Sequence, residues 1–221
     1  MWIKIILTVG IAGIVMGIFL SLFQMVKVIP LIHEAESYEE KVDHHHEDES
    51  NPLLQSDLGR KVYTFAANIL TATGFAFLMT GVFFLAKKMN WIRGLGVGLL
   101  AYLSFVLAPS LLIPPNLPGI DSGDVLIRQS WWFFTVLSTA TGLGLLVFFY
   151  RKPLYIAIAV TLLIMPHLVG GSQIQILANH VPERIISDFL AASLVTNLIF
   201  WLCEGALTGY LYEKFILREK S

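Results

Sequence analysis

The sequence is poor in charge and holds a single cysteine. Asp, Glu, Lys and Arg make up 14% of its 221 residues, whereas a typical soluble domain carries about 25%. The lone Cys203 excludes a disulfide within the chain, and its apolar neighbours indicate a packing role. Because 56% of the residues are hydrophobic, we expect a chain that lies mostly in lipid, with no soluble domain of useful size.

The motifs of common enzyme classes are also missing. The chain has no G-x-x-x-x-G-K-[S/T] nucleotide loop, no H-E-x-x-H, no G-x-S-x-G and no C-x-x-C-H. We therefore predict that the protein is not an enzyme, has no resident cofactor and does not bind nucleic acid. A membrane enzyme with a metal site within 109–132, near Asp121, Asp124 and Trp131-Trp132, is the weakest alternative, since no nucleophile or acid–base pair is apparent. The two tryptophans are more simply read as interfacial anchors.

Long apolar segments dominate the chain. A membrane-spanning helix needs about 20 apolar residues, and alternating polarity, which would indicate a barrel, is missing. The predicted fold is therefore an all-α integral membrane protein with six transmembrane helices, in a single polytopic membrane domain over 1–221. The segment 154–170 is short, and without it the count would be five. The candidate spans are 5–29, 63–86, 93–113, 131–150, 154–170 and 188–211.

The basic residues indicate an orientation. Six spans place nine of the fifteen Lys and Arg on one side and six on the other, and the positive-inside rule then puts both termini in the cytoplasm. Five spans would split the basic clusters between the two sides. The nine are Lys4, Lys87, Lys88, Arg93, Arg151, Lys152, Lys214, Arg218 and Lys220.

An internal repeat is also present. Three segments begin with Arg and reach Phe five residues later, at 60–65, 128–133 and 184–189. Thr-Ala-Thr-Gly follows at the same offset in the first two, at 71–74 and 139–142. This pattern predicts three similar helical hairpins in one orientation, each made of an odd-numbered span and the span that follows it. The alternative is that small residues and Thr simply recur in membrane helices, where they allow close packing.

An acid- and His-rich loop at 33–58 interrupts the apolar pattern. Residues 30–49 hold four His and eight Asp or Glu, and imidazoles with carboxylates are ligands for divalent first-row metals. A solvated, low-complexity loop is the alternative. If the first helix continues past Pro30, His33 and Glu36 become neighbours on one face. Such mixed ligands suit Co²⁺, Ni²⁺ or Zn²⁺ better than Ca²⁺.

Polar residues inside the spans are costly in lipid and therefore informative. Asn68 and Asn197 are predicted to form hydrogen bonds between helices. Pro166-His167 offers a carbonyl and an imidazole close together. Glu204 is either an ion or proton site, or it reaches cytoplasmic water near the end of the last helix. We expect tight helix contacts at a set of glycines: Gly10, Gly13, Gly17, Gly94, Gly96, Gly98, Gly205 and Gly209.

Several short motifs, taken together, resemble the CbtA family of probable cobalt transporter subunits over nearly the whole chain. The matching residues are Gln24, Pro30-Leu31-Ile32, Glu34-Ala35-Glu36, Tyr38-Glu39, Ala66, Asn68, Leu70-Thr71, Ala108-Pro109, Pro114-Pro115-Asn116-Leu117-Pro118-Gly119, Arg128-Gln129, Trp131-Trp132, Pro166-His167-Leu168, Ala191-Ala192-Ser193-Leu194, Thr196-Asn197 and Phe200-Trp201. The chain departs from the family pattern at His33 and Glu204.

The resemblance implies a transporter subunit in a bacterial inner membrane that takes up Co²⁺ for cobalamin synthesis. It also implies a small partner, the CbtB-type subunit, with one membrane span and its own histidines; a homo-oligomer is left open. The alternative is a non-transporting metal sensor or scaffold that works with a partner. Our candidate metal ligands are Glu34, Glu36, Glu39, His44, His45, His46 and His167.

Overall fold

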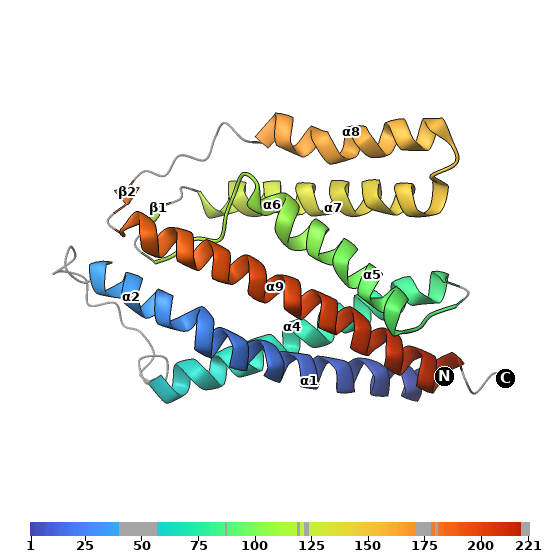
Figure 1. Cartoon of the computed structure of the whole chain (residues 1–221), viewed down its shortest axis with the longest axis horizontal. Coiled ribbons are helices and arrows are strands. Elements are labelled where there is room, and N and C mark those ends of the chain that lie inside the picture. The colour runs from blue at the N-terminus through green and yellow to red at the C-terminus, as the bar shows by residue number, and fades with distance from the viewer. Residues whose placement is uncertain are drawn as a thin grey trace. The chain divides into compact units, whose positions relative to one another are not determined.

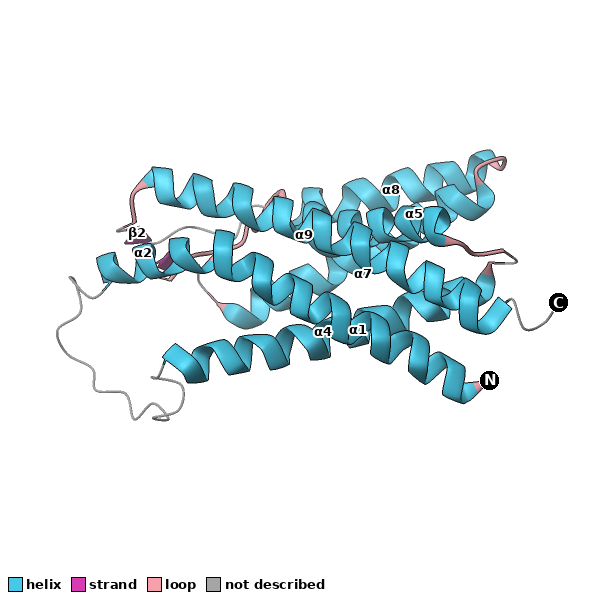
Figure 2. Cartoon of the chain, turned by 60° about the horizontal axis from the view of Figure 1, so that its bottom comes forward, coloured by secondary structure: helices cyan, strands magenta, loops and turns pink. Residues whose placement is uncertain are grey.

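A computed structural model describes residues 1–39, 57–86, 88–118, 120–121, 124–170, 178–179 and 181–217. Six of its helices are long and apolar enough to cross a membrane, which confirms the predicted count and includes the short fifth segment. Figures 1 and 2 show these helices. They are α1 (Trp2–Lys27), α4 (Asp57–Leu85), α5 continued by η1 and α6 (Trp91–Ser110), α7 (Val125–Phe149), α8 (Pro153–Gly170) and α9 continued by η2 (Glu183–Leu217).

The remaining elements are short. Helix α2 (Ile29–Glu39) follows α1 after the single turn residue Val28, so the helical path continues past Pro30, the condition under which His33 and Glu36 become neighbours. Strand β1 (Ile120–Asp121) pairs antiparallel with β2 (Ala178–Asn179). The turns of π-helix are η1 (Leu103–Leu107) and η2 (Glu213–Leu217), and η1 leads into the short α6 (Ala108–Ser110).

The chain forms two compact units. The first unit comprises Met1–Pro30, Asp43–Leu99 and Val195–Ser221, and the second unit comprises Leu31–Val42 and Leu100–Leu194. The first therefore holds α1, α4, most of α5 and the C-terminal part of α9. The second holds most of α2, the end of the third span, α7, α8 and the beginning of α9. That the whole chain is one membrane domain stays a prediction.

Helices α1 and α4 lie side by side in the first unit (Figure 2). A side chain at Gly13 would meet Thr73, and one at Gly17 would meet the backbone of Ile69, so both glycines allow close approach as predicted. Gly10 faces open space, so its predicted contact was wrong.

A polar contact joins the same two helices. The side-chain amide of Asn68 donates to the Ser21 hydroxyl at 3.0 Å and to the Gln24 side-chain oxygen at 2.7 Å. This confirms the hydrogen bond between helices that was expected for Asn68. Helix α1 also contacts η2, so the beginning and the end of the described chain lie at one end of this unit (Figure 1).

A second glycine contact joins α5 to α9 within the first unit. Gly94 and Gly98 lie against Gly205, and Gly209 lies against Asn90 and Gly94, so the two backbones almost touch. Both helices carry G-x-x-x-G, which brings two glycines to one face. The nearby Gly96 faces open space, so its predicted contact was wrong.

Helices α7 and α8 lie side by side in the second unit (Figure 1). Gly142 on α7 packs against the Ala159 carbonyl oxygen and Leu163 on α8. The Asp124 carboxylate caps α7 by accepting from the backbone N–H groups of Leu126 and Ile127. The predicted grouping assigned α7 and α8 to different hairpins. Three equivalent hairpins therefore stay a prediction.

Proline explains the irregular end of the third span. Pro109 has no backbone N–H, and in a regular α-helix its ring would clash with the carbonyl one turn earlier. The chain forms the wider turn η1 just before it, and the Ala108 N–H donates to the Leu103 carbonyl. π-Helical turns of this kind relieve such conflicts and often occur near functional sites. A pocket opens beside this turn.

Candidate functional site

An imidazole and a carboxylate meet on α2. His33 and Glu36 are three residues apart, which places them on one helix face. The His33 Nδ1 lies 3.1 Å from the Glu36 Oε2, and the two side chains are 48% and 26% exposed. The structure thus confirms that these two groups are neighbours, as the helical spacing predicted. It also leaves both accessible to water and to an approaching ion.

Glu34, in contrast, is held by an arginine from a distant part of the chain. The Arg184 Nη2 lies 2.9 Å from the Glu34 Oε1, and its Nη1 lies 3.4 Å from the Asp188 Oδ2. A metal ion at Glu34 would have to compete with this guanidinium. Sequence reasoning missed Arg184 because it lies 150 residues away from Glu34. The repeated Arg-to-Phe spacing was the one signal that singled it out.

His167 lies near the end of α8, next to a buried tryptophan. Its Nδ1 is buried and has no hydrogen-bond partner among the described residues. The Trp131 ring is edge-on to the imidazole, with centroids 6.4 Å apart, and its indole N–H donates to the Pro166 carbonyl at 3.2 Å. A side chain at Gly170 would collide with the indole.

This arrangement corrects the prediction for Trp131. We expected an interfacial anchor, but the side chain is only 8% exposed. Its indole N–H donates to a carbonyl near the C-terminal end of α8, that of Pro166. Trp131 therefore fixes the position of the Pro166-His167 segment from the neighbouring helix.

The other candidate ligands are not gathered by the structure as described. The side chain of Glu39 and residues His44, His45 and His46 lie outside the described residues. Within the described part of the chain, no group of three or more His, Cys, Asp or Glu side chains could hold a metal ion. Glu34, Glu36, Glu39, His44–His46 and His167 therefore stay predicted ligands.

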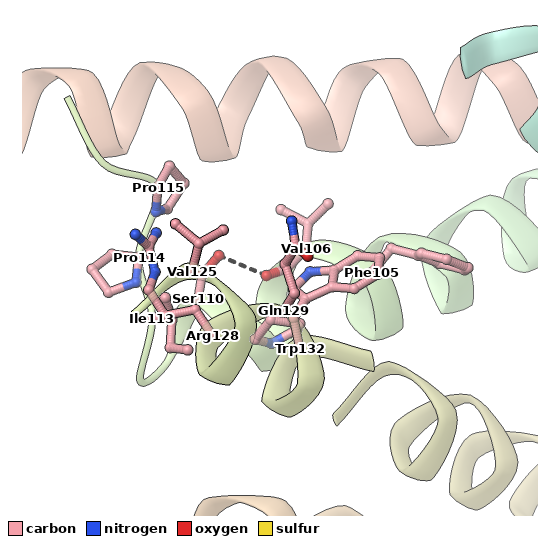
Figure 3. A pocket seen from close by; sticks show the side chains of 11 residues that line it. Phe105, Val106, Ser110, Ile113, Pro114, Pro115, Val125, Arg128, Gln129 and Trp132 are labelled. Atoms are coloured by element: carbon pink, nitrogen blue, oxygen red, sulfur yellow. Dashed lines mark hydrogen bonds between the residues drawn. The ribbon is translucent and has the colours of Figure 1, made fainter. Parts of the chain in front are cut away.

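A pocket of about 380 Å³ opens beside η1 (Figure 3). Its polar side chains are Ser110, Arg128 and Gln129, and no carboxylate or imidazole among the described side chains, which do not include that of Asp121, lines it. The enzyme alternative expected acids here, but Asp124 caps α7 instead. The complete lining is Phe105, Val106, Pro109, Ser110, Ile113, Pro114, Pro115, Val125, Arg128, Gln129 and Trp132. The composition of this pocket does not suit a metal ion.

Glu204 lies far from these groups in the sequence, within the C-terminal part of α9 in the first unit. It is 0% exposed. Neither carboxylate oxygen has a hydrogen-bond partner among the described residues. Of the two alternatives for this residue, contact with water near the helix end was therefore wrong.

The sequence model of the CbtA family, described as a probable cobalt transporter subunit, matches residues 2–213. The chain belongs to this family. The match includes five of the long apolar helices, the sixth as far as Glu213, and the acid- and His-rich segment that follows α2 in the sequence. No curated protein and no solved structure matches the sequence. Membership of the CbtA family and six apolar helices indicate a multi-pass membrane protein. The family is described as a transporter subunit, which implies a partner.

Proposed function

We propose that this CbtA protein takes up Co²⁺, as one subunit of a transporter, and supplies cobalamin synthesis. The observation that carries this proposal is the His33–Glu36 pair at the end of a helix that continues a membrane span. One imidazole nitrogen and one carboxylate oxygen, 3.1 Å apart, form the beginning of a mixed N/O site. Such a site favours first-row divalent metals over Ca²⁺.

The acid- and His-rich loop would extend this pair. Glu39 ends the same helix, and His44, His45 and His46 follow it closely in sequence. In the proposed orientation this loop faces outward, where metal arrives, and raises its local concentration. His167, with its buried free Nδ1, would receive the ion at a later step. Glu34 would bind metal only after leaving Arg184.

The membrane potential is large enough to drive this uptake. A potential of 100 mV is worth about 2.3 kcal/mol per elementary charge, or about 4.6 kcal/mol for a doubly charged ion. This corresponds to roughly a thousandfold concentration ratio, at about 1.4 kcal/mol per factor of ten. The lack of a nucleotide-binding loop is therefore compatible with net accumulation of Co²⁺.

We also propose the membrane in which the protein lies, its orientation and its partner subunit. Both termini lie in the cytoplasm, with the chain in the bacterial inner membrane, because the basic residues gather on that side. A small CbtB-type subunit with one membrane span completes the transporter. Large apolar side chains such as Phe133 and Leu168, which are 60% and 80% exposed, would contact lipid or that helix.

A non-transporting metal sensor is the second candidate. The same His33–Glu36 pair and the following loop would bind outside metal and report it to the partner. The two candidates differ in one observable, since the sensor binds metal without moving it. No nucleophile accompanies the His33–Glu36 pair among the described site residues, so nothing at the site favours an enzyme.

The test is uptake of ⁵⁷Co²⁺ into cells that express the chain with and without its small partner. The key variant is the double substitution Glu36→Gln/His167→Ala. Glu183→Gln is the matched control, because Glu183 is an exposed carboxylate in the first turn of α9 and has no role in the proposed site.

Transport predicts uptake by the wild type and by Glu183→Gln, and a loss of tenfold or more in the double variant. Unchanged uptake in the double variant would remove these residues from the path. Metal binding by purified protein, together with no uptake in any combination, would favour the sensor.

A further inference from the structure

A fully buried carboxylic acid lies in the first unit without any visible role in metal capture. Glu204 is 0% exposed, and its neighbours Phe200 and Trp201 are each 2% exposed. Both of its oxygens lack a hydrogen-bond partner among the described residues. Buried polar groups in proteins are nearly always hydrogen-bonded, so an exception needs an explanation.

The hydroxyl groups on the same face of α9 are unusual in the same way. Thr208 lies one turn after Glu204, and Thr196 lies two turns before it, so the three share a face. Both threonines are buried, and neither hydroxyl has a partner among the described residues. Thr8 on α1 shares this property.

Eight other Ser and Thr hydroxyls in the described helices are satisfied locally. They donate to the carbonyl four residues earlier, for example Thr80 to Ala76 and Thr73 to Ile69. This local bond is the usual way to satisfy a hydroxyl inside a helix, and the buried Thr139 on α7 is another exception to it. The Thr208 hydroxyl, one turn from Glu204, is therefore available to the carboxyl group or to whatever it binds.

The titratable groups around Glu204 do not offer it a positive partner. Helix α4 has none from Thr64 to Leu85. Within the first unit, α5 has Arg93, which is exposed and donates to the Lys88 carbonyl. Helix α1 has Lys4 and Lys27 near its ends. On η2 and on the part of α9 that belongs to the first unit, the groups are Cys203, Tyr210, Tyr212, Glu213 and Lys214.

The nearest of these cations along the helix is distant. Lys214 is ten residues from Glu204, which corresponds to about 15 Å at 1.5 Å per residue. Its ammonium lies over the rings of Tyr210 and Phe215, at 5.8 Å from each centroid. Among the described residues, no cation lies within hydrogen-bond distance of the buried carboxyl oxygens.

An ionised carboxylate buried without a partner costs many kcal/mol, so such groups hold a proton or a cation. The packing here is tight, because Gly205 lies directly against Gly94 and Gly98. A metal ion needs several ligands and space, whereas a proton needs neither. No imidazole accompanies the carboxyl group, and oxygen ligands alone do not suit Co²⁺.

We propose that Glu204 holds an exchangeable proton, which it releases to water and regains as the transporter cycles. The proton leaves the carboxylic acid for water and returns to the same oxygen pair, with Thr208 as a hydrogen-bond donor to the carboxylate while it is ionised. The proton site stands on the geometry around Glu204. Its coupling to Co²⁺ movement rests on the proposed function.

The first experiment tests the site without any transport. Dicyclohexylcarbodiimide, an apolar reagent, adds to protonated carboxyl groups in apolar surroundings. Purified protein is treated with it, and the modified peptides are identified by mass spectrometry. We expect modification of Glu204 in the wild type and in Glu183→Gln, and none at this position in Glu204→Gln. A water-soluble carbodiimide is expected to leave Glu204 unmodified.

Two results would overturn the proton site. The first is no modification of Glu204 by the apolar reagent in protein that gel filtration shows to be monodisperse. The second is protection by NaCl, but not by choline chloride, at constant pH, which would assign the site to Na⁺. Glu204→Met, which preserves side-chain volume, is the second unreactive variant if Glu204→Gln does not fold.

The second experiment tests coupling. Proteoliposomes containing the chain and its small partner are held at zero membrane potential, and ⁵⁷Co²⁺ accumulation is measured with and without an imposed pH gradient. We expect the gradient to change accumulation at least tenfold in the wild type and in Glu183→Gln. Glu204→Gln is expected to lose this response while still exchanging Co²⁺ across the membrane at equal concentrations.

A full response to the pH gradient in Glu204→Gln would overturn the coupling. If the wild type moves no Co²⁺ at all, the proposed function fails, yet the labelling result still decides whether Glu204 is a proton site. The two failures are therefore distinguishable.

Discussion

Two acidic regions of this CbtA protein differ in almost every physical respect. On α2, Glu34 and Glu36 are 40% and 26% exposed, and each has a partner, Arg184 and His33 respectively. On α9, Glu204 is 0% exposed and has no hydrogen-bond partner among the described residues. A carboxyl group thus occurs once in an exposed region with charged partners and once in a buried region with no partner among the described residues.

The difference in exposure and partners determines what the carboxyl groups of each region can do. Exposed pairs exchange partners cheaply, because water screens the charges and replaces the lost contacts. Such pairs are suited to collect an ion and release it. A buried carboxyl group cannot change its charge without a large free-energy cost. Loss of its proton therefore requires a change in the packing around it. Such a group can couple the gain or loss of a proton to that change in packing.

The substitution with the strongest expected effect tests the contact between α5 and α9, in which Gly205 follows the buried Glu204 in the sequence. Gly98→Leu places a side chain against the backbone of Trp201 and Gly205. Overpacking of this kind typically costs about 1–3 kcal/mol, and more where backbone must move. We expect a loss at or above the top of that range in unfolding titrations with SDS.

Gly96→Leu is the matched control for this substitution, because it lies two residues away on the same helix and faces open space. Its unfolding free energy is expected to stay the same or rise slightly, since leucine is the better helix former. Equal losses in the two variants would show that the glycine contact does not hold α5 and α9 together.

The next effect concerns the hydrated region. His33→Ala removes the imidazole of the proposed mixed site, and we expect Co²⁺ affinity to fall at least about tenfold, because loss of a group that only supports a metal ligand already costs that much. Calorimetric titration of purified protein gives the affinity, and Glu183→Gln serves as the control. An unchanged affinity would exclude His33 and leave Glu36 with other partners.

Deletion of residues 41–50 tests whether the loop only concentrates metal. We expect weaker uptake of ⁵⁷Co²⁺ at low external metal and unchanged uptake at saturating metal, because the path itself is intact. Replacement of the same ten residues by a Gly/Ser sequence controls for loop length. Equal loss at every metal concentration would mean that the loop is part of the path.

The smallest effect concerns the ion pair that holds Glu34. Arg184→Gln removes the contacts to Glu34 and Asp188, and exposed pairs of this kind contribute about 0.2–1 kcal/mol. Thermal stability should change little, while Co²⁺ affinity should rise as Glu34 becomes free to bind. A fall in affinity would mean that Arg184 positions Glu34 rather than competing for it.

Some of the polar residues could be interpreted from the sequence because their partners are local. His33 and Glu36 meet through helix spacing alone, and the spacing of Gly13 and Gly17 correctly predicted a face for close packing. The same reasoning failed at Gly10 and Gly96, which face open space. A G-x-x-x-G spacing identifies a helix face, and it does not reveal whether another helix lies against that face.

The arrangement around Trp131 could not be predicted, because its partners are on another helix. Its bond to the Pro166 carbonyl and its contact with Gly170 depend on how α7 packs on α8. The ion pair between Glu34 and Arg184 likewise joins segments 150 residues apart. Sequence patterns indicate which residues are neighbours along one helix or strand. They carry no information on contacts between different helices.

The six spans, the lack of an ATP-binding loop and the acid- and His-rich segment can be predicted from the amino-acid sequence. These follow from composition, because a bilayer selects long apolar helices whatever their partners are. Which polar groups are satisfied depends on the tertiary structure. It pairs Asn68 with Ser21 and Gln24, joins Glu34 to Arg184, and leaves Glu204 buried without a hydrogen-bond partner among the described residues. Except where a hydroxyl bonds to its own helix, a buried polar group is satisfied by what another helix brings within hydrogen-bond distance, and no residue carries that information alone.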